Sequence, residues 1–312
     1  MSSKSVKVSV PATVSNVGCG FDVMGFAIDL VCDEITLTIN NKIDCLNITR
    51  ITGDDGRLPR DARANTCTQA MQSMLDELNL LIGIDIKISK KIGFGSGLGS
   101  SAASAVAGVY ALNELLGKPL IVDQLLRHAM EGEHVASKSY HADNVAPCLY
   151  GGFVLIRSYN PIDIIKLEPA ADLYCTIIHP DIEIKTSEAR KLLGKTLPLK
   201  KAISQWGNVG ALVAAIMSNN MDLLGRAIHD EVAEPKRSAL IPGYYDIKNA
   251  ALTAGAKGCN ISGSGPAIFA FSDSEEKAAF IGKEMKKAAG RHGLKSKLYI
   301  SKVNKFGPKV ID

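Results

Sequence analysis

The sequence predicts an α+β fold in two parts, with a boundary near Pro169. Segments that alternate like strands are interspersed with segments that have the apolar spacing of amphipathic helices. Residues 159–169 interrupt this pattern with two prolines and are expected to be a linker. At 312 residues, the chain is long enough for two medium-sized domains, which we place at residues 1–167 and 168–312.

In the first part, residues 6–10, 34–40 and 45–51 are expected to be strands. Residues 65–79 carry apolar side chains three and four positions apart, which predicts an amphipathic helix. Isoleucines alternate with polar residues over 84–89, so this segment is expected to be a half-buried strand that leads into a glycine-rich loop. Helices are then expected from Ser100 to about residue 116 and over 122–137, followed by a strand at 148–156.

The second part is expected to begin with a strand at 173–179, followed by three helices that end near residue 232. A helix at 244–254 precedes two strands within 259–271, which a Gly-Ser-Gly-Pro turn joins. A helix at 275–289 and a strand at 297–303 complete the prediction. The chain therefore mixes helices and strands in both parts.

Composition argues against several classes of partner. A net charge of +4 and 5% aromatic residues are too little to indicate a nucleic-acid-binding protein. Residues 92–113 are uncharged over a length that could span a bilayer, but their glycines and serines argue against a membrane span. We expect no nucleic-acid partner and no membrane insertion.

The cysteines and the N-terminus indicate the compartment. Seven scattered cysteines have neither CxxC nor zinc-site spacing, which favours reduced, structural thiols. The first ten residues contain no hydrophobic stretch typical of a secretory signal. We expect a cytoplasmic protein.

The glycine-rich loop carries the clearest functional signal. Its alternating glycines let the backbone approach an anion closely, and the helix that follows presents unpaired N–H groups at its positive end. Serine hydroxyls could bind phosphate or Mg²⁺, and small alanines keep the helix slim. The residues expected to bind the nucleotide phosphates are Gly93, Phe94, Gly95, Ser96, Gly97, Leu98, Gly99, Ser100, Ser101, Ala102 and Ala103. A flexible Gly/Ser turn is the alternative, but the strand–loop–helix position favours a phosphate site.

Other phosphate-binding patterns do not fit. The one Gly-Lys-Thr triplet, at 194–196, has Ala189 where a Walker A loop needs glycine. A dinucleotide fingerprint that began at Gly95 would need glycine at position 100, where Ser100 occurs. The protein-kinase HRD and DFG motifs are absent.

Three segments together resemble the GHMP family of small-molecule kinases. GSGLGSSAAS (95–104) is similar to the central motif of the family, PATVSNVGCGFDVMG (11–25) to its N-terminal motif, and ISGSGPAIFAF (261–271) to its C-terminal glycine motif. The resemblance implies a ribosomal S5-domain-2-like N-terminal domain and a ferredoxin-like C-terminal domain. It also implies ATP in the cleft between them, with Asn65 near the adenine.

Further segments resemble the branch of this family that acts on L-homoserine: YHADNVAPCLYGG (140–152), IKTSEARKLL (184–193) and EPKRSALIPGY (234–244). L-Homoserine is a zwitterion with a primary hydroxyl. Arg190 and Arg237 could bind its carboxylate, although each could instead be a surface arginine paired with Glu188 or Glu234.

The N-terminal motif (11–25) could provide the remaining contacts to such a substrate. Asn16 and Asp22 suit its ammonium and hydroxyl groups, with ordinary Asx-turn chemistry as the alternative for Asn16. Gly263 in the C-terminal glycine motif (261–271) is also expected at the substrate site. His141 could donate to the substrate or simply pack.

The resemblance also implies the catalytic and metal-binding residues. Asp143 is expected to orient the hydroxyl, with possible base character, and Thr186 to hydrogen-bond the transferring phosphoryl group. Ser101 and Glu133 resemble the Mg²⁺ ligands. Glu131 would point about 200° away from Glu133 on a helix, so only one of the two can face the cleft.

The expected reaction is transfer of the γ-phosphate of ATP to the hydroxyl of L-homoserine, which gives O-phospho-L-homoserine in threonine biosynthesis. One alternative is a GHMP kinase for mevalonate or a sugar. Another is a non-catalytic ligand-binding homologue. The resemblance also suggests a homodimer.

Overall fold

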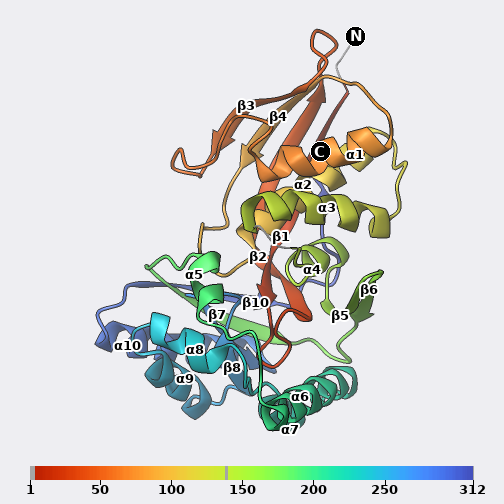
Figure 1. Ribbon diagram of the computed structural model, residues 1–312. Coiled ribbons are helices and arrows are strands. Elements are labelled where there is room, and N and C mark those ends of the chain that lie inside the picture. The colour runs from red at the N-terminus through yellow and green to blue at the C-terminus, as the bar shows by residue number, and fades with distance from the viewer. Residues whose placement is uncertain (1–3, 138–139, 312) are drawn as a thin grey trace.

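The computed structural model describes residues 4–137 and 140–311, which form two sheets (Figure 1). The larger sheet has the order β11-β1-β2-β4-β3, and β5 extends it from β2 and pairs with β6. Its strands are β1 (Ser5–Ser15), β2 (Met24–Ile39), β3 (Leu46–Thr52), β4 (Ile84–Ser89), β5 (Phe153–Tyr159), β6 (Ile162–Leu167) and β11 (Lys309–Val310). The smaller sheet has the order β10-β7-β9-β8, formed by Ser296–Lys302, Tyr174–Pro180, Ile268–Ser272 and Gly258–Ile261 respectively.

Helices cover the two sheets separately (Figure 1). The helices beside the larger sheet are α1 (Thr66–Glu77), α2 (Ser100–Leu115), α3 (Val122–Ser137) and α4 (Val145–Tyr150). Those of the second part are α5 (Thr186–Lys191), α6 (Leu199–Ser218), α7 (Met221–Ala227), α8 (Glu234–Arg237), α9 (Tyr244–Thr253) and α10 (Glu275–Arg291), with a 3₁₀ turn at Ser238–Leu240. Helix α2 is buried along most of its length, because its many alanines let β1, β2, α1 and α3 pack closely around it. None of the helices in the described ranges is long and apolar enough to cross a membrane.

The expected linker at 159–169 is wrong, because β5 and β6 form an antiparallel hairpin there. Pro161 lies in the turn between the two strands, so it does not interrupt either ladder. Residues 148–150, expected in a strand, end the short helix α4. This segment is buried on nearly all sides, and a short apolar run without periodicity does not distinguish a helix from a strand.

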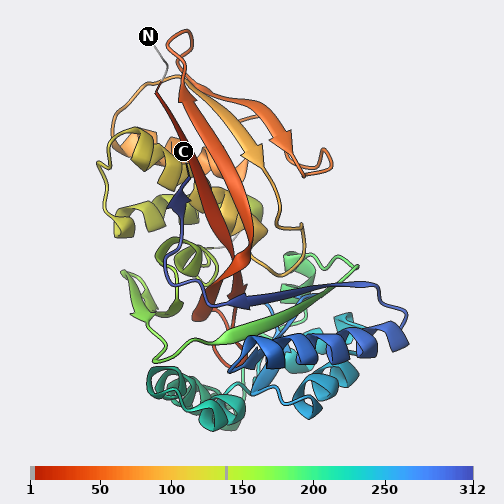
Figure 2. The ribbon, with the colours of Figure 1, turned by 180° about the vertical axis from the view of Figure 1, so that it is seen from behind.

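Long antiparallel pairing extends the first two strands beyond the prediction. Strands β1 and β2 pair from Ser5 to Ser15, with an irregularity between Pro11 and Ala12. Strand β11, which pairs with Val8 and Ser9 of β1, was not predicted, because it is only two residues long. Figure 2 shows this last segment running back beside β1. The division into residues 1–167 and 168–312 falls between β6 of the larger sheet and β7 of the smaller one, and it stays a prediction.

A buried ion pair connects the elements that hold the glycine-rich loop. Lys90, just after β4, pairs with Asp33 of β2, and both side chains are almost fully buried. The Lys90 ammonium also donates to the Ser100 carbonyl oxygen (2.8 Å) and to the Ser104 hydroxyl (2.9 Å). The Asp33 carboxylate accepts the N–H groups of Lys91 (2.7 Å) and Ile92 (3.0 Å). The pair therefore joins β2, the entry of the loop and the first turn of α2.

Removal of one member of this pair should be strongly destabilising. Asp33→Ala would leave the Lys90 charge buried without its partner, and we expect the free energy of unfolding to fall by about 3–5 kcal/mol. Urea denaturation measures this loss. The matched control is Glu34→Ala, which removes the half-buried partner of Lys91 and Lys7 and should cost less than about 1 kcal/mol. Equal losses for the two variants would contradict the importance of the buried pair.

Candidate active site

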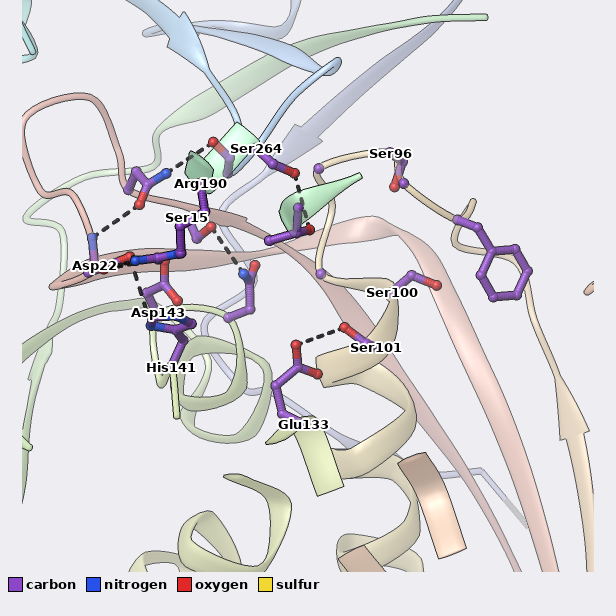
Figure 3. Close-up of a pocket in the computed structure, with 18 of the residues that line it drawn as sticks. Ser15, Asp22, Ser96, Ser100, Ser101, Glu133, His141, Asp143, Arg190 and Ser264 are labelled. Carbon is purple, nitrogen blue, oxygen red and sulfur yellow. Dashed lines mark hydrogen bonds and ion pairs between the residues drawn. The ribbon is translucent and has the colours of Figure 1, made fainter. Parts of the chain in front are cut away.

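One pocket gathers side chains from both parts of the chain (Figure 3). Its walls are the turn between β1 and β2, the glycine-rich loop with the start of α2, one residue of α3, the loop before α4, and segments around α5, α8 and the 262–265 turn. The predicted site residues that line it are Asn16, Asp22, Phe94, Gly95, Ser96, Gly97, Gly99, Ser100, Ser101, Glu133, His141, Asp143, Thr186, Arg190, Arg237 and Gly263.

Five predicted residues do not line this pocket. Leu98, Ala102 and Ala103 are buried, and Gly93 lies at the entry of the loop. Asn65 is the N-cap of α1: its side-chain oxygen accepts the Cys67 N–H (3.0 Å), and its amide nitrogen donates to the Pro59 carbonyl (2.8 Å). The amide of Asn65 thus stabilises the start of a helix, and its role at the adenine stays a prediction.

The conformation of the glycine-rich loop depends on close backbone contacts. Gly97 has φ of +77°, and a Cβ there would lie 2.4 Å from the carbonyl oxygen of Ser262. The Ser262 hydroxyl donates to the Gly97 carbonyl (2.5 Å), and this hydrogen bond holds the loop against the C-terminal glycine motif. Helix α2 begins at Ser100 with Gly99 as its N-cap, so no side chain caps its first N–H groups. An uncapped N-terminus of a long helix is a suitable site for an anion.

Ser101 and Glu133 bring two hard oxygens to this helix terminus. The Ser101 hydroxyl donates to the Glu133 carboxylate at 2.9 Å. Glu133 is on α3 and only 9% exposed. Glu131 is exposed and accepts a hydrogen bond from the Tyr140 hydroxyl (3.1 Å). Glu133, therefore, is the acidic side chain of α3 that lines the pocket.

The charged groups expected at a zwitterionic substrate lie at the other end of the pocket. The Arg190 guanidinium donates to both oxygens of Asp22, at 2.7 to 3.1 Å. Arg237 is 3% exposed and donates to the Gly263 carbonyl oxygen (2.7 Å). Both guanidinium groups lie over the Phe21 ring, at 5.4 and 5.3 Å from its centre.

The proposed surface ion pairs of these arginines are wrong. Arg190 pairs with Asp22 instead of Glu188. Arg237 is buried, and the carboxylate of Glu234 contacts Tyr244, Lys248 and Asn260 instead.

The turn between β1 and β2 holds Asn16 and Asp22 in a strained backbone. Asn16, Val17 and Asp22 have φ of 69°, 46° and 60°, and left-handed geometry is costly for a β-branched residue such as Val17. The Asn16 side chain accepts the Asp22 N–H (3.1 Å) and donates to the Gly263 carbonyl (3.1 Å). Asn16 therefore does have a structural role in the turn, and it also lines the pocket.

Three further residues line the pocket that the sequence analysis did not select: Ser15, Asn144 and Ser264. Asn144 donates to the Ser15 hydroxyl (3.0 Å) and accepts from the Thr13 hydroxyl (2.7 Å). These hydrogen bonds connect the N-terminal motif to the loop of Asp143. The Ser264 hydroxyl lies 3.4 Å from that of Thr186. Each is adjacent to a residue that was selected, so their place inside the motifs was the available signal.

Comparison with known proteins identifies the family. The chain matches the GHMP kinases N terminal domain over residues 65–152 and the GHMP kinases C terminal domain over residues 212–292. Homoserine kinase from Chlorobium phaeobacteroides is 48% identical, over 99% of this chain and 100% of that protein. The crystal structure of homoserine kinase from Cytophaga hutchinsonii is 56% identical, with a TM-score of 0.96 over 99% of this chain and 98% of that one.

The chain belongs to the GHMP kinase family, in its homoserine kinase branch. The crystal structure of L. major mevalonate kinase shares the fold at 19% identity, with a TM-score of 0.68 over 98% of this chain and 96% of that one. The two-domain GHMP fold expected from the sequence is therefore confirmed.

The pocket of this GHMP kinase contains two carboxyl groups with raised pKa values. Burial raises the pKa of Asp143 to about 7, and the negative charge of Asp22 adds to the effect. Burial likewise raises the pKa of Glu133 to about 7, with a further contribution from Asp143. His141, whose ring nitrogen lies 3.9 Å from Asp22, has a pKa lowered by burial, which favours the neutral imidazole. Clustered carboxyl groups with raised pKa values are typical of functional sites.

The buried carboxylate of Asp143 should cost stability at high pH. Its pKa is higher in the folded chain than in the unfolded chain, so stability declines as pH rises from about 4 to about 7 and then stays constant with respect to this group. Asp143→Asn replaces the carboxyl group by an amide that cannot ionise. We expect this variant to raise the free energy of unfolding by about 1–3 kcal/mol at pH 8 and by less at pH 5. Thermal unfolding at the two pH values measures the difference.

The matched control is Asp273→Asn, because Lys277 lowers the pKa of that exposed carboxyl. This control should show no gain at pH 8. A stability loss for Asp143→Asn at pH 8, or a gain that does not depend on pH, would contradict the prediction.

Proposed function

We propose that this protein is a homoserine kinase that transfers the γ-phosphate of ATP to the hydroxyl of L-homoserine and releases ADP and O-phospho-L-homoserine, a step of threonine biosynthesis. One observation carries the proposal: a phosphate-type glycine loop shares a pocket with Asp22, Arg190 and Arg237. The names of the relatives, at 48% and 56% identity over nearly the whole chain, agree with it.

The glycine-rich loop and the N-terminus of α2 would hold the phosphates of ATP. Two features support this role: the first turn of α2 is uncapped, and the loop backbone packs at Gly97 against the C-terminal glycine motif. Phe94 lines the same side of the pocket, and we call this side, formed by residues 94–101, the phosphate wall. Phosphoryl transfer depends mostly on positioning and on charge neutralisation, and this wall can provide both.

Ser101 and Glu133 fit a magnesium site. A hydroxyl and a carboxylate are hard oxygen ligands, and Mg²⁺ typically takes only one or two carboxylates, with waters and substrate phosphates as its other ligands. The described part of the chain has no cluster of three or more His, Cys, Asp or Glu side chains that could hold a metal. When bound, Mg²⁺ would neutralise charge on the phosphate oxygens. Ionised Glu133 would be the form that binds it.

Asp22, Arg190 and Arg237 would recognise the zwitterion. In the structure, Arg190 and Asp22 pair with each other, so the site already holds one cation and one anion at hydrogen-bond distance. A substrate carboxylate could take the place of Asp22 at the Arg190 fork, and the substrate ammonium could take the place of Arg190 at Asp22. Buried Arg237 would add a second positive charge for the carboxylate.

Asp143 would orient the substrate hydroxyl and could accept its proton. With its pKa near 7, the carboxyl is partly ionised at neutral pH, which suits a proton acceptor. Thr186, at the start of α5, lines the same pocket and would hydrogen-bond the transferring phosphoryl group. His141 would remain neutral and could donate one hydrogen bond to the substrate.

A GHMP kinase for mevalonate or a sugar is the second candidate. Mevalonate also has a carboxylate, so the arginines alone do not distinguish the two substrates. Asp22 and Asp143 favour homoserine, because a substrate without an ammonium would bring no positive charge to these two carboxylates. A non-catalytic homologue is a weaker candidate, because the glycine loop, Glu133 and Asp143 share one pocket.

A coupled assay for ADP release tests the proposal. With Mg-ATP, we expect turnover of L-homoserine well above background, and little turnover of mevalonate or galactose. Turnover of mevalonate or a sugar without turnover of homoserine would overturn the substrate assignment. ATP binding without any turnover would favour the non-catalytic candidate.

We also propose a cytoplasmic homodimer without a nucleic-acid partner. The seven cysteines are free, which suits a reducing compartment. Helix α6 supports a dimer, because it presents an exposed apolar stripe made of Leu199, Ile203, Trp206 and Met217. These positions follow helical spacing, and a Cβ on the nearby Gly207 or Gly210 would meet nothing within 4 Å. A large exposed apolar stripe is typical of a protein interface.

Trp206→Glu should disrupt the dimer, because it places a charge in the centre of this stripe. Light scattering coupled to size-exclusion chromatography should give twice the 33.2 kDa chain mass for the native protein and a single chain mass for the variant. The control is Phe280→Glu, which changes another exposed aromatic residue, on α10, and should leave the dimer intact. A native monomer, or a dimeric Trp206→Glu variant, would contradict this interface.

A further inference from the structure

Tyr159 bridges two loops of the pocket without lining it. It is the last residue of β5, in the hairpin that the sequence analysis had expected to be a linker. Its hydroxyl donates to the backbone carbonyl of Asp22 (2.7 Å) and accepts the backbone N–H of Ala142 (3.2 Å). Ala142 lies between His141 and Asp143. One hydroxyl group therefore joins the turn that carries Asp22 to the loop that carries Asp143.

These two loops need such a connection. Their carboxylates repel each other, since the charge of Asp22 is one of the causes that raise the pKa of Asp143. The turn of Asp22 is also held in left-handed geometry, with φ of 60° at Asp22 itself. Close packing assists, because a Cβ on Gly25 would lie 1.9 Å from the carbonyl oxygen of Asp143. The Tyr159 hydroxyl adds a directional hydrogen bond to each side.

The hydroxyl is suited to this double role. Burial, followed by the charge of Asp143, raises the pKa of Tyr159 above its usual range, so the group keeps its proton. It therefore has one donor and one acceptor function in use. Tyr159 as a whole is 38% exposed, which indicates that it is not held mainly for its contribution to the apolar core.

We propose that Tyr159 is a positioning residue for the acceptor substrate, which sets the separation of Asp22 and Asp143 by holding the backbone of both loops. Asp22 would contact the ammonium group and Asp143 the hydroxyl, so this separation must match the distance between these two groups of the substrate. The inference rests on the proposed function, because it assigns Tyr159 to recognition of homoserine. Among the described residues, the hydrogen bonds of the Tyr159 hydroxyl go to Asp22 and Ala142 and not to the phosphate wall.

Tyr159→Phe removes only the hydroxyl and tests the proposal. Loss of two hydrogen bonds that position the acceptor site should raise KM for L-homoserine about tenfold. KM for ATP should change by less than about twofold, because the phosphate wall is left intact. Steady-state kinetics with each substrate varied in turn measure both constants, and calorimetric titration of the protein with L-homoserine measures binding directly.

The matched control is Tyr150→Phe. The Tyr150 hydroxyl donates to Asp123 on the surface, so this variant also loses a tyrosine hydrogen bond but lies outside the pocket. It should keep both KM values. If Tyr159→Phe also keeps both KM values, or raises both equally together with a loss of thermal stability, the hydroxyl is only structural and the proposal fails. If the native protein itself does not turn over homoserine, the proposed function fails instead.

Discussion

The ion pair between Lys90 and Asp33 is the interaction on which the phosphate wall depends. It is almost fully buried and binds four segments at once: β2, the end of β4, the loop entry and the first turn of α2. A buried pair gains little over apolar packing, but it fixes geometry, because each partner is costly to leave alone. Here, it fixes the direction in which the first N–H groups of α2 point.

The proposed acceptor end of the pocket differs, because its charges pair with each other and could exchange partners when a substrate binds. Arg190 and Asp22 satisfy each other in the structure and are only partly buried. In the proposed function, the carboxylate of a zwitterion would replace Asp22 at Arg190 and its ammonium would replace Arg190 at Asp22, so that neither side chain would be left unpaired. Arg237 and Asp143 are buried more deeply, so in the proposed function their contributions would depend on a substrate that brings a carboxylate for Arg237 and a hydroxyl for Asp143.

The sequence predicted the parts of the site that have a local signature. The glycine loop follows a strand and opens a helix, which indicated a phosphate site. Asp22, Arg190 and Arg237 were indicated by their place in the family motifs together with their residue types, because the types alone left surface ion pairs open for the arginines. It did not predict contacts that depend on tertiary pairing. The bridge made by Tyr159 is such a contact, because it joins segments distant in the chain, and local periodicity carries no signal for it. The β5–β6 hairpin and the cap made by Asn65 are local, and they were missed because two prolines indicated a linker and the family resemblance placed Asn65 at the adenine.

Recognition of a zwitterion is tested most directly by the specificity of the protein for both charges of the acceptor substrate. kcat/KM for L-homoserine should be compared with kcat/KM for 4-hydroxybutanoate, which lacks the ammonium, and for 3-amino-1-propanol, which lacks the carboxylate. Because each analogue leaves one charged group of the pocket without its partner, we predict a loss of about 100-fold or more for both. If either analogue retains kcat/KM within about tenfold of homoserine, Asp22, Arg190 and Arg237 do not recognise a zwitterion.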